Sequence, residues 1–291
     1  MQDGFRYYHA MLTRGLLGDL FEIGSGRALL MGILNVTPDS FSDGGRFIEP
    51  DRAIEHALRM VDEGADIIDI GGESSRPGAR EVSLGEELDR VMPVIEGLNG
   101  KLGKPISIDT RRSAVARAAC RAGAVMINDI SGLRNDPQMA QTAAEFGAWL
   151  VLMHMKGTPA TMQLDIHYDD LLGEIGSFLA AAAEKAVAAG VEKSKIIIDP
   201  GIGFGKTTVH NLVILKNLDR FAKLGYPVLV GASRKSFIGN TLGLPVEQRL
   251  EGSLAAAVYA VLKGAAIVRV HDVSATRRAL RIIEAIEGAE G

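Results

Sequence analysis

The sequence has few cysteines, few aromatic residues and little excess charge, and each shortage excludes a class of protein. Cys120 is the only cysteine among 291 residues, which excludes an internal disulfide, and its setting in AVARAACRAG predicts a buried helix position. A net charge of −4 without a long Lys/Arg block argues against a nucleic-acid partner. No apolar run approaches the ~20 residues that span a bilayer, and the N-terminus lacks the order of a signal peptide. We therefore expect a cytoplasmic protein with no membrane partner.

From Ala28 onward, short apolar runs rich in Ile and Val alternate with longer amphipathic segments. Several of these segments end in glycine, the usual residue just beyond a helix. Continuous apolar strands joined by helices predict a parallel sheet covered on both faces. The runs are residues 28–36, 66–72, 105–110, 124–130, 148–154, 196–201, 227–233 and 267–271.

Eight such units over about 260 residues match the closed (β/α)8 barrel, or TIM barrel, in number and length. We predict a single α/β barrel domain over residues 28–291, preceded by an N-terminal extension, residues 1–27, that has no assigned role. An open doubly wound sheet is the alternative, because periodicity does not show whether a sheet closes.

Polar residues stand at the C-terminal ends of all eight predicted strands, where barrels of this kind carry their active sites. A single Asp at a strand end is often only the N-cap of the next helix. Eight polar ends together instead predict one common site. The residues are Asn35, the loop 73–78, Asp109, Asn128 with Asp129, His154, Asp199, Ser233–Ser236, and Arg269 with His271.

The segment DPGIGFGKTT (199–208) has only a superficial likeness to a phosphate loop. A P-loop needs glycine where the chain has Pro200, and Lys206 stands where the dinucleotide fingerprint needs its third glycine. What remains is a glycine-rich turn that begins at Asp199, with Phe204 placed to lie against a flat ligand. Zinc is not expected either, since the six histidines form no close pair and thiolates are lacking.

Asp109 and Asp199 belong to the third and sixth predicted strands, so a closed barrel places them on roughly opposite sides of its mouth. A carboxylate accepts two parallel N–H bonds from an amidine-like edge, and Asn128 adds a donor and acceptors beside it. The pattern suits a planar 2-amino-4-oxo pyrimidine ring, as in guanine or a pterin. A structural ion network of these acids with Lys235 and Arg269 is the alternative.

The segment GASRKSFIGN (231–240) places Ser236 at the start of a short helical segment after the seventh strand, where barrels often bind anions. Arg269 and His271 follow on the eighth strand, and alternation in IVRVH gives them the same facing. This cluster of positive groups on an acidic protein predicts an anionic substrate.

Eight motifs occur in order between Met31 and Val273: GILNVTPDSFSDGG, GGESSRPGA, SIDT, NDISG, LMHM, DPGIGFGKT, GASRKS and RVHDV. In this combination the chain closely resembles the dihydropteroate synthase family of bacterial folate biosynthesis. The resemblance implies a transferase that condenses 6-hydroxymethyl-7,8-dihydropterin diphosphate with 4-aminobenzoate. The products would be 7,8-dihydropteroate and pyrophosphate. The resemblance also implies a homodimer.

The resemblance further implies a role for each matching residue. The implied catalytic residues are Asp109, Lys235, Arg269 and His271. The implied pterin ligands are Asp109, Asn128, Met153, Asp199, Phe204 and Lys235; the diphosphate ligands are Asn35, Ser75, Arg269 and His271; the aminobenzoate ligands are Arg76, Pro77, Phe204 and Ser236. Asn35 is also the implied protein ligand of an Mg²⁺ cofactor. Position 75 is Ser where the family usually has Thr, which keeps the hydroxyl.

The polar loops 35–45 and 73–78 are expected to form a mobile lid. Cleavage of the methylene–oxygen bond would leave a cation delocalised over the dihydropterin, and a lid would shield it from water. Two alternatives remain. A pterin-binding methyltransferase of the same barrel class has no need of the positive cluster, and a non-catalytic pterin-binding paralogue has no need of every motif residue.

Overall fold

The computed structural model describes residues 27–37, 50–75 and 78–289. The predicted N-terminal extension therefore lies outside the described residues except for Arg27. Most of the predicted lid loop 35–45, and both Arg76 and Pro77, also lie outside them.

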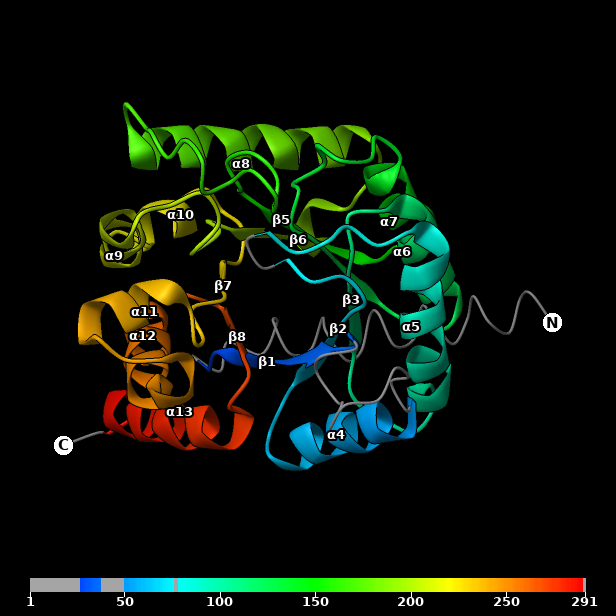
Figure 1. Ribbon diagram of the computed structural model, residues 1–291, viewed down its shortest axis with the longest axis horizontal. Helices are drawn as coiled ribbons and strands as arrows, with labels where there is room; N and C mark the ends of the chain where they lie inside the picture. Colours follow the sequence, from blue (N-terminus) through cyan, green and yellow to red (C-terminus); the bar gives the residue numbers. More distant parts are fainter. Residues whose placement is uncertain (1–26, 38–49, 76–77, 290–291) are drawn as a thin grey trace.

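The described chain forms one eight-stranded parallel sheet in the order β6-β5-β4-β3-β2-β1-β8-β7. The two outermost strands are joined by a bridge between Ile198 and Val228, and the amide of Ile198 donates to the carbonyl of Pro227 at 3.0 Å. The sheet therefore closes into a barrel, which confirms the (β/α)8 prediction over the open sheet (Figure 1). The strands are β1 (Leu29–Asn35), β2 (Ile67–Gly71), β3 (Ile106–Asp109), β4 (Met126–Asp129), β5 (Trp149–Met153), β6 (Ile196–Asp199), β7 (Leu229–Val230) and β8 (Ile267–Val270).

Helices between the strands form the outer ring of the barrel (Figure 1). Their inward faces carry small and apolar side chains, as on α4, where Ala53, Ala57 and Met60 recur at helical spacing and are fully buried. The helices are α4 (Pro50–Asp62), α5 (Leu84–Leu98), α6 (Ser113–Arg121), α7 (Met139–Phe146), α8 (Leu171–Ala188), α9 (Thr208–Lys216), α10 (Asp219–Ala222), α11 (Ser236–Leu242), α12 (Leu250–Leu262) and α13 (Val273–Glu287), with short 3-10 turns η2 (Lys193–Lys195) and η3 (Val246–Gln248).

The strands alternate between two buried faces. One face packs against the helices and includes Ile68, Ile108 and Ile127. The other faces the barrel interior, where ten side chains fill the lower part. They are Leu29, Met31, Ile67, Val125, Met126, Trp149, Val151, Ile197, Leu229 and Ile267. Side chains two residues apart on a strand lie on the same face. A residue two positions after a member of this interior set, towards the C-terminal end of its strand, therefore also faces the interior, nearer the barrel mouth.

Two predictions about single features can be scored against this fold. Cys120 is fully buried in α6, as expected, and burial raises the pKa of its thiol to about 12. None of the helices in the described ranges has the length and apolar character that crossing a bilayer requires.

Candidate active site

Five of the polar residues predicted at the strand ends share the interior face of the barrel: Asn35, Asp109, Asn128, Asp199 and Arg269. Two others do not join this face: Asp129 is one residue beyond Asn128 and lies on the opposite side of β4, and the His154 ring packs edge-on against Phe178 of α8. Asn128 lies two residues after Met126, Asp199 two after Ile197, and Arg269 two after Ile267, and all three earlier residues belong to the interior cluster. Asp109 is paired in register with Asn128 across β3 and β4, and Met153 with Asp199 across β5 and β6. The alternation of the strands thus brings the predicted site residues to one mouth.

Arg269 bridges two carboxylates across the barrel. Its Nε donates to Asp69 Oδ2 at 2.6 Å, and its terminal Nη2 donates to Asp109 Oδ2 at 2.8 Å. The Asn128 amide donates to the same Asp69 oxygen at 3.0 Å. The ion network considered as an alternative is therefore present between Asp109 and Arg269.

Asp69 was missed by the sequence analysis. It lies in the middle of β2, is fully buried, and its Oδ1 has no hydrogen-bond partner in the described structure. The signal was a carboxylate inside the apolar run DIIDIGG, where a buried charge requires a partner. That partner, Arg269, is 200 residues away along the chain.

A second group of residues lies at the β6 and β7 ends. Asp199 accepts a hydrogen bond from the Gly201 amide at 2.7 Å, and Lys235 donates to the carbonyl of Ile202. The Lys235 ammonium lies 4.3 Å from the centre of the Phe204 ring, a cation–π contact. Phe204 packs on a small apolar cluster that includes Met153. This wall combines a carboxylate, a cation and an aromatic face, as a planar polar ring requires.

Burial shifts the pKa values of these groups toward neutrality. It raises the pKa of Asp109 to about 7, against the opposing effect of Arg269. It also raises the pKa of Asp199 and lowers that of Lys235 to about 8, against the opposing charge of Asp199. Such shifts occur where buried charged groups are kept for function.

The predicted anion-binding segments lie at the ends of β7 and β8. His271 Nδ1 is 3.0 Å from Ser233 Oγ, which also accepts from the His271 amide at 3.2 Å. Lys235 is the N-cap residue of α11 and Ser236 its first residue, as the sequence predicted. Arg234 instead turns away and pairs with Asp272 at 2.5 Å. Ser236 and His271 thus lie at neighbouring strand ends.

The loop after β2 forms one side of a hollow beside Asp109. The hollow has a volume of about 240 Å³, part of it open to solvent. It is lined by Glu73, Ser74, Ser75, Asp109, Thr110, Arg111, Ile130 and Pro159. Ser75 is therefore brought to the site, whereas the predicted positions of Arg76 and Pro77 lie outside the described residues. Glu73 and Arg111 line the hollow without having been assigned a role from the sequence.

Lys206 is not part of a phosphate loop. Its ammonium is buried and donates to the carbonyls of Phe204 at 3.0 Å and His154 at 3.3 Å, with His154 Nδ1 also at 3.0 Å. Burial holds the pKa of Lys206 well below its ordinary value. Gly201, with φ +71°, lies so close to the His154 carbonyl that a Cβ atom would overlap it. Through its bonds to the His154 and Phe204 carbonyls, Lys206 links the end of β5 to the loop after β6.

Lys206→Met should lower the free energy of unfolding by about 1–3 kcal/mol, because two buried carbonyls lose their donor. Neither the variant nor the parent should bind ATP by calorimetry. Lys216→Met, at an exposed position of α9, is the matched control and should leave stability unchanged. ATP binding that is lost only in Lys206→Met would restore the phosphate-loop interpretation.

Asn35 ends β1 and is half-buried at the barrel mouth, next to Gly71 in register. Within the described ranges, no group of three or more His, Cys, Asp or Glu side chains could hold a metal ion. Mg²⁺ needs only one or two protein oxygens when substrate phosphates and water complete its shell. A single amide oxygen at Asn35 fits that kind of shared site and no other metal site.

A closed parallel barrel with a buried cation–carboxylate bridge at its strand ends belongs to the (β/α)8-barrel enzymes, whose ligands bind at this end. Residues 31–271 match the family model described as pterin binding enzyme. The chain belongs to this family.

Relatives of known structure and sequence agree with this assignment. The dihydropteroate synthase of Bacillus subtilis (strain 168) is 50% identical over 260 residues, covering 89% of each chain. The structure of Xanthomonas albilineans dihydropteroate synthase with 4-aminobenzoic acid superposes with a TM-score of 0.86 at 47% identity, over 91% of this chain and 95% of that one. The structure of the Yersinia pestis dihydropteroate synthase in a sulfonamide drug complex superposes with a TM-score of 0.86 at 49% identity, over 91% of this chain and 96% of that one.

Proposed function

We propose that the chain is a dihydropteroate synthase. It condenses 6-hydroxymethyl-7,8-dihydropterin diphosphate with 4-aminobenzoate and releases pyrophosphate. The observation that carries the proposal is the meeting of Asp109, Asn128, Asp199 and Lys235 with Arg269 at one barrel mouth. Family membership, and the names of relatives about half identical, support it.

The pterin ring lies between the two carboxylate groups in this proposal. Asp199 receives the amino edge, with Asn128 and Asp109 on the opposite side and Met153 and Phe204 at the faces. A carboxylate that faces two N–H donors forms strong, charge-assisted hydrogen bonds. These residues orient the methylene carbon toward the incoming amine.

The diphosphate leaves toward the ends of β7 and β8. Arg269 and His271, with Ser75, stabilise the charge that develops on the departing pyrophosphate. Mg²⁺, held by Asn35 together with the substrate phosphates, would further neutralise that charge. The arylamine is neutral at pH 7, so the reaction needs no strong general base. Ser236, at the start of α11, binds the carboxylate of 4-aminobenzoate, with Phe204, Arg76 and Pro77 completing that pocket.

The test is pyrophosphate release by the purified protein with pterin diphosphate, Mg²⁺ and 4-aminobenzoate, each omitted in turn. Release should require both organic substrates and be lost with EDTA. Methyl transfer from methyl-tetrahydrofolate without pyrophosphate release would point to the methyltransferase alternative. Pterin binding without either reaction would point to a non-catalytic paralogue.

The pH dependence of kcat/KM for the pterin substrate should be bell-shaped. Asp109 becomes a carboxylate as pH rises through about 7, and Lys235 loses its positive charge above about 8. Activity should therefore rise through the first value and fall beyond the second. Lys235→Arg should remove the alkaline fall, because a guanidinium stays charged. An alkaline fall that persists in this variant would assign that limb to another group.

We further propose a homodimer, with a second copy covering one side of the barrel. Apolar side chains are exposed on α9, α11, α12 and α13, which lie together on one side of the barrel (Figure 1). They include Val209, Leu212, Leu242, Leu250, Tyr259, Leu262, Ile282 and Ile286. Exposed apolar side chains that gather on adjacent helices are typical of protein interfaces.

Sedimentation should show a dimer that Leu262→Glu dissociates, weakening association by about 10-fold or more, since a charge would be buried in the interface. Leu84→Glu is the matched control, because Leu84 is exposed at the start of α5, on the opposite side of the barrel (Figure 1). A parent protein that sediments as a monomer at micromolar concentration would contradict the dimer.

A further inference from the structure

We infer that Arg111 is a positioning residue that, through Glu73, holds the loop after β2 so that Ser75 faces the diphosphate end of the substrate. The inference rests on the proposed function for the identity of that substrate. Arg111 follows β3 two residues after Asp109, and Glu73 follows β2 two residues after Gly71. Both line the hollow that Ser75 shares with Asp109.

The Glu73 carboxylate joins three segments. Its Oε2 accepts from the Arg111 guanidinium at 2.7 Å, and its Oε1 accepts from the Val82 amide at 3.4 Å. Glu73 and Val82 lie at the two ends of the loop that carries Ser75. One side chain thus holds the loop ends together and attaches them to the strand that carries Asp109. Only 11% of the Arg111 side chain and 13% of the Glu73 side chain are exposed, so solvent screens the pair little.

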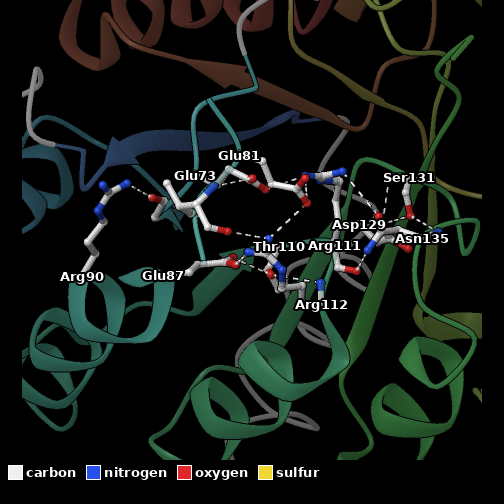
Figure 2. A network of polar contacts seen from close by, with 12 residues as sticks. Glu73, Glu81, Glu87, Arg90, Thr110, Arg111, Arg112, Asp129, Ser131 and Asn135 are labelled. Atoms are coloured by element: carbon white, nitrogen blue, oxygen red, sulfur yellow. Dashed lines mark hydrogen bonds and ion pairs between the residues drawn. The ribbon is translucent and has the colours of Figure 1, made fainter. Parts of the chain in front are cut away.

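Arg111 is itself fixed from the β4 side (Figure 2). Asn135 donates to the Arg111 carbonyl at 2.9 Å and also accepts from its guanidinium at 3.4 Å. The backbone N–H of Asn135 donates to Ser131 Oγ at 3.2 Å, and this hydroxyl in turn donates to the buried carboxylate of Asp129 at 2.6 Å. The network therefore spans the loops after β2, β3 and β4. Arg111 is the residue that connects the β2 loop to the other two, through its ion pair with Glu73.

Other contacts hold the base of the same loop without Arg111. Arg90 on α5 donates to the Gly72 carbonyl at 2.7 Å, and Arg112 donates to the Val82 carbonyl at 2.7 Å. Arg112 also pairs with the buried Glu87, which accepts from Thr110 at 2.6 Å. Loss of Arg111 should therefore displace the loop without detaching it, so the fold should persist while Ser75 moves.

Carboxylates surround the guanidinium of Arg111. Its guanidinium is paired with Glu73, and Glu81 lies 3.9 Å away. A bound phosphate group would have to compete with these carboxylates. Arg269 is also paired with two carboxylates, Asp69 and Asp109, so the Glu73→Gln variant described below, rather than the pairing itself, separates positioning from direct anion binding.

The experiment measures binding directly, so that it does not depend on turnover. Calorimetry with Mg²⁺ compares pyrophosphate with 6-hydroxymethylpterin, which lacks the diphosphate, in the parent, Arg111→Met, Glu73→Gln and the double variant. Pyrophosphate affinity should fall about 10-fold in each single variant and no further in the double, because both remove the same contact. Affinity for 6-hydroxymethylpterin should change less than about 2-fold, since Asp199 and Lys235 are untouched.

Arg117→Met is the matched control, because Arg117 pairs with Glu145 and Thr142 on the outer helices. It should leave both affinities unchanged, and Arg111→Lys should restore part of the pyrophosphate affinity. Unchanged or tighter pyrophosphate binding in Glu73→Gln, with loss in Arg111→Met, would make Arg111 a direct ligand and overturn the inference. Equal loss of both ligands would indicate a general structural role, which also overturns it. An inactive parent that still shows the predicted pattern would count against the proposed reaction but not against this role.

Discussion

Arg269→Met should reduce kcat/KM by at least about 1000-fold, since the residue both stabilises the leaving diphosphate and orders the mouth. It should also lower the free energy of unfolding by about 3–5 kcal/mol, because Asp69 and Asp109 would lose their shared cation. Steady-state pyrophosphate release and urea denaturation measure the two effects separately.

The double variant Asp69→Asn/Arg269→Met separates these roles. Removing the charge of Asp69 takes away one buried anion, so the double variant should regain much of the lost stability. It should remain inactive, because the diphosphate still lacks Arg269. Recovered activity in the double variant would mean that Arg269 acts only by neutralising Asp69.

Asp199→Ala should weaken pterin binding by about 2–4 kcal/mol, or roughly 30- to 1000-fold, because the donors of the pterin edge would be buried unpaired. The Gly201 amide also loses its acceptor, so a small loss of stability should accompany the change. Titration calorimetry with 6-hydroxymethylpterin measures the affinity.

Asp219→Ala is a suitable control for this titration, because Asp219 is exposed at the start of α10 and pairs with the exposed Lys223. Its pterin affinity should equal that of the parent. An Asp199→Ala protein that binds pterin as tightly as the parent would remove Asp199 from the pocket.

The barrel could be predicted from sequence because its signals are local. Each apolar run became a strand, and the polar residue at its end lies where strand alternation places it. The strand predicted at 227–233 is the least regular, since only Leu229 and Val230 form β7. Pro227 has no amide hydrogen to donate, although its carbonyl still accepts from Ile198 and so helps to close the barrel.

The contacts within the site could not be predicted in the same way. Asp69 is not at a strand end, and nothing local to β2 indicates that its cation comes from β8. Lys206 lies in a glycine-rich turn, and nothing local indicates that this turn folds back on His154 and buries the side chain. The Arg111–Glu73 pair depends on the spacing of two loops in space. Local patterns indicate the face of a side chain, whereas its partner depends on the closed barrel.

The bridge made by Arg269 also bears on how the protein is made. Asp69 and Asp109 are synthesised long before β8, so during translation the two carboxylates have no opposing guanidinium. Only when the last strand docks between β1 and β7 does this cation reach them. Closure of the barrel and assembly of the site are therefore the same event. A nascent chain without β8 has no competent pocket, and a substrate that binds the pocket favours the fully closed fold.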